Sequence, residues 1–275
     1  MKKRKGARLG QHFLKHDWAA AKLAHATELG KDEVFLEIGP GKGALTKELL
    51  KLGPVIAIEK DTALVGKLKE TFAPDIEKGR LKLVEGDVRD FNPETCNPAR
   101  TELVRSGGLK PGAYVVAANI PYYITGEIIR QFLTAKKQPR AMALLVQKEV
   151  AGRIVARDAR ESILSLSVKA YGTPRVIAKV GKSHFSPPPS VDSAILVIEN
   201  ISKRFFDDIS EADFFALVHT GFASKRKMLV GNLSRTLNKK TVSAAFAQCG
   251  IPEKARAEDV RLSGWKCLSA TLDKK

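Results

Sequence analysis

The most informative stretch of the sequence is Asn-Ile-Pro-Tyr at residues 119–122, which directly follows an apolar run at residues 113–118. Such a run predicts a buried strand that presents the Asn119 amide at its carboxyl end. The side-chain oxygen of Asn119 and a main-chain carbonyl near Pro121 can accept the two hydrogens of an adenine amino group and turn its delocalised lone pair toward an electrophile. Pro121 stiffens the turn, and Tyr122 offers a ring on which a base can stack. Taken alone, the segment fits a β-turn with a core tyrosine equally well.

A glycine-rich loop precedes this segment in the chain. An apolar run at residues 34–38 leads into Gly-Pro-Gly-Lys-Gly at residues 39–43 and then into a helical pattern at residues 44–52. Gly39 and Gly41 let the backbone approach a ligand closely, and the first N–H groups of the helix point at that ligand. The loop predicts a site for a nucleotide-like cofactor.

Acidic residues end the next two predicted strands. Glu59 closes an apolar run about 20 residues after the glycine loop, where an acid that binds ribose hydroxyls bidentately is expected. Asp87 follows the next apolar run, and we expect it to contact an adenine ring together with Val88. Each acid alone is more simply a solvated carboxylate, and the glycine pattern with Glu59 also fits a nicotinamide dehydrogenase. A dehydrogenase gives no account of Asn119, so the four strand ends together favour a methyl-transfer site.

Apolar runs alternate with helical patterns along the first 200 residues, which predicts an α/β fold with a mostly parallel, doubly wound, seven-stranded sheet. Ligands of such sheets bind outside the carboxyl ends of the strands. The strand signal stops after residue 199, so we expect a catalytic domain at residues 1–200 and a small helical domain at residues 201–275. The strands are predicted near residues 34–38, 55–59, 81–85, 113–118, 141–146, 175–180 and 193–199.

The composition favours a polyanionic partner. The chain carries 47 Lys and Arg against 30 Asp and Glu, a formal net charge of +17, and an imbalance of this size is typical of proteins that bind nucleic acid. No run approaches the ~18 apolar residues that a spanning helix needs, and the N-terminus lacks the apolar core of a signal peptide. We therefore expect a cytoplasmic protein with no membrane partner.

The chain contains three widely spaced cysteines. Cys96, Cys249 and Cys267 form no Cys-x-x-Cys pair, so neither a disulfide framework nor a zinc site is indicated. We expect three reduced thiols and no bound metal.

Basic residues gather in two places. Residues 1–8 contain five basic and no acidic side chains. In the small domain a helix is predicted to open at Phe222, with an apolar stripe at Leu229, Leu233 and Leu237. Its remaining surface can contact RNA phosphates, although a merely solvated face fits the same pattern. The predicted RNA-binding side chains are Lys225, Arg226, Lys227 and Arg235.

With these motifs in order, the chain resembles the KsgA-type ribosomal RNA adenine N6-dimethyltransferases over nearly its whole length. Gly-Gln-His-Phe-Leu at residues 10–14 is similar to the family's N-terminal cofactor-binding segment, and residues 37–41 to its glycine motif. Glu59, Asp87 and the Asn-Ile-Pro-Tyr segment match the cofactor and target-base motifs, and residues 147–150 and 185–193 also fit. Position 12 is often Asn in bacterial members and is His here.

The resemblance implies a Rossmann-like methyltransferase that uses S-adenosylmethionine. His12 and Leu14 would contact the cofactor, and Phe185 would hold a flipped adenine opposite Tyr122. The resemblance also implies that the methyl transfer is repeated on the same nitrogen, and that the substrate is a pair of adjacent adenosines in the 3′-terminal hairpin of small-subunit rRNA. The implied partner is the small ribosomal subunit, and we expect the protein to be a monomer.

Two other interpretations of the resemblance stay open. A resistance-type methyltransferase of large-subunit rRNA has the same cofactor motifs, but the predicted helix at residues 222–233 looks more like the ribosome-assembly branch. A non-enzymatic assembly factor could keep the fold. Intact Asn119, Tyr122, Glu59 and Asp87 argue against that interpretation.

Overall fold

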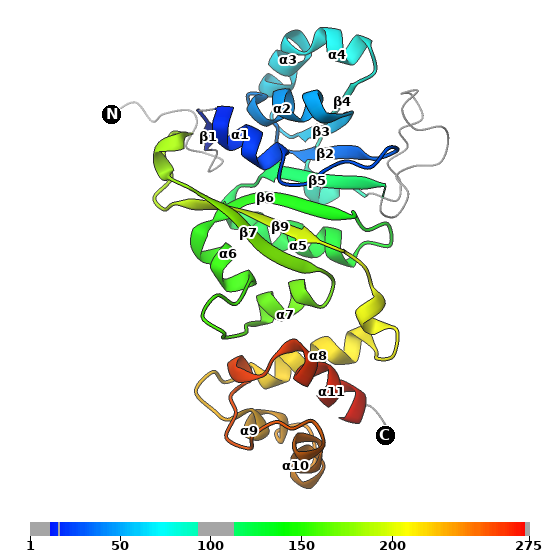
Figure 1. The fold of residues 1–275 in the computed structure, drawn as a ribbon, viewed down its shortest axis with the longest axis vertical. Coiled ribbons are helices and arrows are strands. Elements are labelled where there is room, and N and C mark those ends of the chain that lie inside the picture. Colours follow the sequence, from blue (N-terminus) through cyan, green and yellow to red (C-terminus); the bar gives the residue numbers. More distant parts are fainter. Residues whose placement is uncertain (1–11, 16, 93–112, 273–275) are drawn as a thin grey trace. The chain divides into compact units, whose positions relative to one another are not determined.

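The computed structural model describes residues 12–15, 17–92 and 113–272. The chain divides into two compact units, each of which is described by itself (Figure 1). The first unit comprises Met1–Ala151 and Thr173–Ile201, and the second comprises Gly152–Gly172 and Ser202–Lys275.

A seven-stranded sheet organises the first unit, with the strand order β4-β3-β2-β5-β6-β9-β7 (Figure 1). The five strands from β4 to β6 pair in parallel, whereas β9 pairs antiparallel with both β6 and β7. The mostly parallel sheet predicted from the sequence is therefore confirmed. The strands are β2 (Val34–Ile38), β3 (Val55–Glu59), β4 (Leu81–Glu85), β5 (Tyr114–Asn119), β6 (Ala141–Gln147), β7 (Thr173–Val180) and β9 (Ser193–Glu199).

Helices cover both faces of this sheet, as the apolar strands require. One core cluster joins Leu23 of α1 and Leu49 of α2 to Phe35 and Val115 of the strands. Tyr114, which alternation turns to the opposite face from Val115, contacts the Phe132 ring of α5 at 6.5 Å between centroids. The helices of this unit are α1 (Asp17–Ala24), α2 (Ala44–Leu52), α3 (Thr62–Thr71), α4 (Ala73–Glu77), α5 (Thr125–Thr134) and α6 (Lys148–Ile154), the last of which runs into the second unit.

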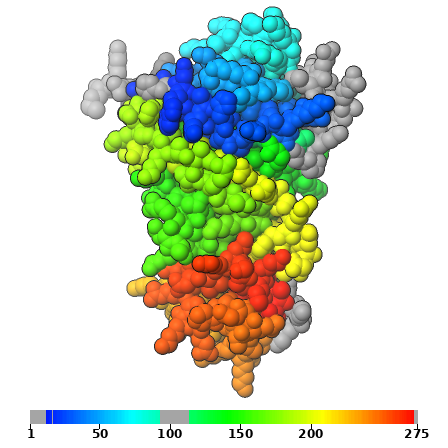
Figure 2. All heavy atoms as spheres, in the orientation of Figure 1, coloured from blue at the N-terminus to red at the C-terminus, as the bar shows by residue number. Residues whose placement is uncertain are grey.

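A separate two-stranded ladder ties the N-terminal segment to a loop late in the unit. β1 (Phe13–Leu14) pairs antiparallel with β8 (Phe185–Ser186), and the Lys15 backbone N–H donates to the His184 carbonyl at 2.9 Å. Figure 2 shows the blue N-terminal atoms beside the yellow-green atoms of this later loop. The ladder brings together two segments that are about 170 residues apart in sequence.

The second unit is helical and is built on buried aromatic and leucine side chains. Trp265, Phe214 and Phe246 are fully buried in it. It contains α7 (Ile163–Lys169), α8 (Glu211–Gly221), α9 (Leu229–Leu233), α10 (Lys239–Gln248) and α11 (Leu262–Leu272). The chain divides differently from the sequence expectation, because residues 152–172, placed in the catalytic domain, pack with the helical unit through contacts of α7 with α8.

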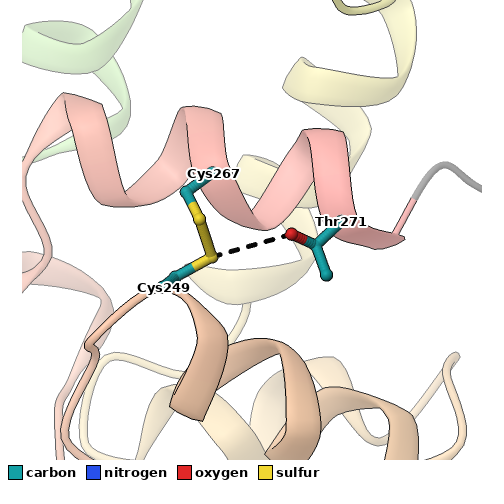
Figure 3. Close-up of a disulfide and its surroundings, with 3 residues drawn as sticks. All are labelled: Cys249, Cys267 and Thr271. Carbon is teal, nitrogen blue, oxygen red and sulfur yellow. Dashed lines mark hydrogen bonds between the residues drawn. A yellow bond between two sulfur atoms is a disulfide. The ribbon is translucent and has the colours of Figure 1, made fainter.

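A disulfide links α11 to the residue that ends α10, which corrects the expectation of three reduced thiols. Cys249 and Cys267 are bonded, with their Cα atoms 5.8 Å apart, and the Thr271 hydroxyl lies 3.8 Å from the Cys249 sulfur (Figure 3). A spacing of 18 residues did not reveal the pair, because only the packing of the two helices brings the side chains together. Cys96 lies outside the described residues.

A substitution at Gly43 shows how much the tight packing of the glycine loop contributes to stability. It has φ +84°, and a Cβ added there would lie 2.5 Å from the Phe72 ring. We expect Gly43→Ala to lower the free energy of unfolding by at least ~2 kcal/mol, from left-handed backbone strain and crowding. Gly66, in the middle of α3, has open space around its Cβ position, so Gly66→Ala should instead stabilise by ~0.5–1 kcal/mol. Urea unfolding measures both, and a Gly43→Ala variant as stable as the wild type would contradict the packing described.

Candidate active site at the carboxyl ends of the strands

A pocket opens where the parallel strands β2, β3 and β5 end. The carboxyl ends of parallel strands meet at one edge of a sheet, so residues far apart in sequence converge there. Nine of the residues predicted from the sequence line it: His12, Gly39, Gly41, Glu59, Asp87, Val88, Asn119, Pro121 and Tyr122.

The glycine loop turns its backbone toward the pocket. Gly39 and Gly41 have φ of +65° and +60°, a region that favours glycine. Among the described residues, apart from Gly39 and its two chain neighbours, no atom lies within 4 Å of the position of a Gly39 Cβ, so a side chain there would fill space that the loop leaves open. A Cβ on Gly41 would lie 2.9 Å from the Phe13 ring, which also lines the pocket.

Glu59, the last residue of β3, is a buried carboxylate that holds two loops. It is 4% exposed. Its Oε2 accepts from the Gly41 backbone N–H at 3.0 Å, and its Oε1 accepts from those of Lys60 and Asp61 at 2.9 Å. These bonds orient the carboxylate and tie the glycine loop to the start of α3.

Asp87 reaches the pocket already paired with two cations. Its carboxylate lies 2.8 Å from Lys60 Nζ and 2.6 Å from a guanidinium nitrogen of Arg89. The hydrogen bonds from Arg89, reinforced by Lys60, hold the pKa of Asp87 well below its usual range. The predicted contact of Asp87 with an adenine amino group therefore involves a charged carboxylate that shares its acceptor sites with these side chains.

Asn119 ends β5 with a fixed amide. Its Nδ2 donates to the His12 carbonyl at 2.8 Å, which leaves the amide oxygen as the acceptor of the group. Next to it, Tyr122 opens the 3₁₀ turn η2 (Tyr122–Ile124), and its hydroxyl lies 2.7 Å from Ser193 Oγ. Burial raises the pKa of Tyr122, so the phenol stays neutral.

The ring beside Tyr122 is the imidazole of His12. The two ring centroids are 5.7 Å apart and the planes are inclined by 28°, while His12 Nδ1 lies 2.8 Å from the Pro187 carbonyl. Phe185, which the resemblance placed opposite Tyr122, is fully buried in the core and does not line the pocket in this structure, and its contact with a target base stays a prediction. Phe185 is buried because the β1–β8 ladder packs it and Leu14 against the core cluster. Leu14 is likewise not brought to the pocket.

Other pocket residues were not identified from the sequence. Phe13, Lys60 and Tyr123 line the pocket, and Tyr123 is 69% exposed. Tyr123 could have been predicted from the sequence, because it is an aromatic residue that directly follows the Asn-Ile-Pro-Tyr segment. For Phe13 the signal was its place in the segment at residues 10–14 that resembles a cofactor-binding segment, while its position at the pocket depends on the ladder with β8.

The predicted RNA-binding side chains lie in the second unit and are all exposed: Lys225, Arg226, Lys227 and Arg235. The predicted helix from Phe222 is wrong, because α9 begins only at Leu229. Asn232, fully buried on α9, donates to the carbonyls of Gly221 and Ser224 at 2.6 and 3.1 Å, and so holds the preceding loop in a non-helical turn. The other predicted basic segment, residues 1–8, lies outside the described residues.

Two negative findings concern the described ranges alone. Within residues 12–15, 17–92 and 113–272, no group of three or more His, Cys, Asp or Glu side chains is placed to hold a metal ion. Nor does any helix in those ranges combine the length and apolarity needed to cross a membrane.

Glu37, the first residue of the glycine motif, is buried on β2. Burial, with the nearby charge of Glu59, raises the pKa of Glu37 to about 8 from its ordinary 4.5, although Thr46 opposes the shift. Between pH 4.5 and about 8 the folded chain keeps this proton and the unfolded chain releases it, so the wild type loses stability as the pH rises, by up to ~1.4 kcal/mol per pH unit.

Glu37→Gln should remove this pH dependence. We expect the stability of the variant relative to the wild type to grow steadily between pH 4.5 and 8 and then to level off. Thermal melts of both proteins across that range measure the difference, and the comparison near pH 4.5 is the internal control. A constant difference across the range would contradict a raised pKa for Glu37.

Comparison with known proteins agrees with this site. The family described as ribosomal RNA adenine dimethylase matches residues 2–274. A "Ribosomal RNA small subunit methyltransferase A" from Dehalococcoides mccartyi is 40% identical over 273 residues, which is 98% of this chain and 88% of the relative. A protein of the same name from Thermosynechococcus vestitus is 34% identical and covers 96% of each chain.

Two solved structures share the fold over nearly the whole chain. A dimethyladenosine transferase from Plasmodium falciparum has a TM-score of 0.77 at 25% identity, covering 96% of this chain and 98% of that one. The 23S rRNA methyltransferase ErmE has a TM-score of 0.75 at 25% identity, covering 95% and 100%. From the site, the relatives and the matching residues together, the chain belongs to the ribosomal RNA adenine dimethylase family of S-adenosylmethionine-dependent methyltransferases.

Proposed function

We propose that this enzyme dimethylates two adjacent adenosines in the 3′-terminal hairpin of small-subunit rRNA, with the chemistry at Asn119. The observation that carries the proposal is the fixed Asn119 amide, whose nitrogen is engaged by the His12 carbonyl while its oxygen remains an acceptor at the pocket. An acceptor in this place, beside the Tyr122 ring, suits the amino group of an adenine.

The pocket fits S-adenosylmethionine on two observations. The backbone at Gly39 leaves space that a Cβ would fill, and the buried Glu59 carboxylate stands at the strand end where ribose hydroxyls can donate to it. When bound, S-adenosylmethionine supplies an electrophilic methyl group. Gly39, Gly41 and Glu59 would hold it, with Val88 against its adenine.

The target base is oriented rather than deprotonated. The Asn119 oxygen and a neighbouring main-chain carbonyl accept the amino hydrogens, and the Tyr122 ring carries the base, with its hydroxyl anchored at Ser193. Because methylation makes the amino nitrogen acidic, its proton leaves readily, and no general base is required. Proximity and orientation supply much of the rate enhancement.

The relatives favour the small-subunit substrate over the large-subunit alternative. The fold does not decide, since the dimethyladenosine transferase and the large-subunit enzyme are almost equally similar in structure. The two relatives that share the most sequence with the chain, of those described above, are both named for the small subunit. The substrate is rRNA, and we propose that the enzyme acts on the small ribosomal subunit and as a monomer.

Methylation of isolated subunits tests the whole proposal. With labelled S-adenosylmethionine and small subunits that lack the modification, we expect label on two adjacent adenosines of the 3′-terminal hairpin and none on large subunits. Asn119→Ala should lower turnover by ~10²-fold while cofactor affinity stays near wild type, because the amide acts mainly as the amino nitrogen rehybridises. Label on large subunits would overturn the substrate, and near-normal turnover by Asn119→Ala would overturn its role.

The cofactor assignment is tested at Glu59. Glu59→Gln keeps the shape of the side chain but removes a charged acceptor, and hydrogen bonds to charged groups contribute ~1.5–3 kcal/mol, so S-adenosylmethionine should bind at least tenfold more weakly. Glu85 ends the neighbouring strand without lining the pocket, so Glu85→Gln is the matched control and should bind normally. Calorimetry measures both. Unchanged affinity in Glu59→Gln, or tighter binding of NAD by the wild type, would remove the assignment.

The basic loop of the second unit is tested by salt dependence. If Lys225, Arg226 and Lys227 bind phosphates, their joint replacement by Gln should weaken RNA binding and lower the slope of log K against log salt by ~0.7–0.9 for each phosphate that is no longer neutralised. Cofactor affinity should not change, since none of the three lines the pocket. An unchanged slope with full methylation would take this loop off the RNA-binding surface.

A further inference from the structure

Trp18 is a large aromatic side chain that the chemistry described so far does not use. The chain has two tryptophans: Trp265 is fully buried, whereas Trp18, on the first turn of α1, is 49% exposed. The ring of Trp18 lies against the imidazole of His184, with centroids 5.6 Å apart and planes inclined by 39°. A half-exposed indole is unfavourable in water, so this pair suits contact with a flat apolar partner.

The pair stands at the end of the ladder that also reaches the pocket. His184 closes the 3₁₀ turn η3 (Lys182–His184) just before β8, and its carbonyl accepts from the Lys15 N–H. His12, at the other end of β1, lines the pocket. From His12 to Lys15 the extended chain spans ~10 Å. A strand of RNA with one base in the pocket can therefore reach the pair with a base only a few nucleotides away.

Charge around the pair favours a polyanion. Lys15, whose backbone N–H donates to the His184 carbonyl, and Lys182, two residues before His184, are both exposed. One exposed acid, Asp17, lies on α1, and Asp192 accepts from the Lys182 backbone N–H at 3.0 Å. Exposed rings next to lysines are the usual platform for unpaired bases, because every base has a face that stacks.

We propose that Trp18 and His184 form a second stacking site, which receives an unpaired base of the substrate RNA close in sequence to the methylated adenosine. The inference rests on the proposed function, since it takes RNA as the substrate. Trp18 stacks on the base, His184 supports the indole from its other side, and Lys15 and Lys182 attract the flanking phosphates. The site positions the strand and takes no part in the methyl transfer.

Tryptophan fluorescence tests the site directly. Titration with a protein-free hairpin RNA that has an unpaired loop should quench the emission and protect it from acrylamide, and Trp18→Phe should abolish both signals because Trp265 is buried. A fully paired RNA of equal length should give neither. Trp18→Ala should bind the hairpin about tenfold more weakly, within the range for removal of one base stack, while Trp18→Phe keeps most of the affinity.

Leu52→Ala, which removes another exposed apolar side chain of the same unit, is the matched control and should bind as the wild type does. Normal RNA binding with unchanged Trp18 emission would overturn the stacking site and leave the proposed function intact. A change in Trp18 emission that is seen only with whole subunits would indicate that Trp18 contacts a ribosomal protein. That result would also overturn the stacking site. Failure of the wild type to methylate subunits would overturn the proposed function itself.

Discussion

The Glu59 carboxylate is the interaction on which the pocket depends. Its two oxygens accept three backbone N–H groups from the glycine loop and from the turn into α3. A buried carboxylate is stable only with such partners, and the loops in turn take their conformation from it. The same acid therefore holds the glycine loop through the Gly41 N–H and also lines the pocket. Glu37, one strand away, has no such set of partners and keeps its proton to a higher pH instead.

The target-base side of the pocket depends on contacts between distant segments. Asn119 is fixed by the His12 carbonyl, and His12 in turn contacts Tyr122 and the Pro187 carbonyl. These residues belong to different parts of the chain, and the β1–β8 ladder brings them together. That ladder also packs Phe185 into the core, so the ring that faces Tyr122 in this structure is His12. The imidazole that contacts Tyr122 thus stands at the position where the resemblance led us to expect a cofactor contact.

The pocket and the exposed basic loop belong to different units. The described residues that line the pocket all belong to the first unit, whereas the exposed Lys225–Lys227 loop belongs to the second. Asn232 holds that loop by bonds to two carbonyls, which keeps the basic side chains out of a helix and on an exposed turn. The Cys249–Cys267 disulfide joins the end of α10 to α11 in the same unit (Figure 3). The bonds that hold the basic loop and those that shape the pocket thus lie in different units.

The sequence by itself determined the sheet and most of the pocket. The strands β2 to β6 and β9 follow apolar runs, and Gly39, Glu59, Asp87 and Asn119 come at strand ends, so parallel pairing alone brings them to one edge. Hydrophobic periodicity and the ends of strands are local features, so they can be recognised in short stretches of the sequence. Only the tertiary structure decided the burial of Phe185, the disulfide, the late start of α9 and the placement of residues 152–172. Each depends on which distant segments pack together, and no short stretch of sequence contains that information.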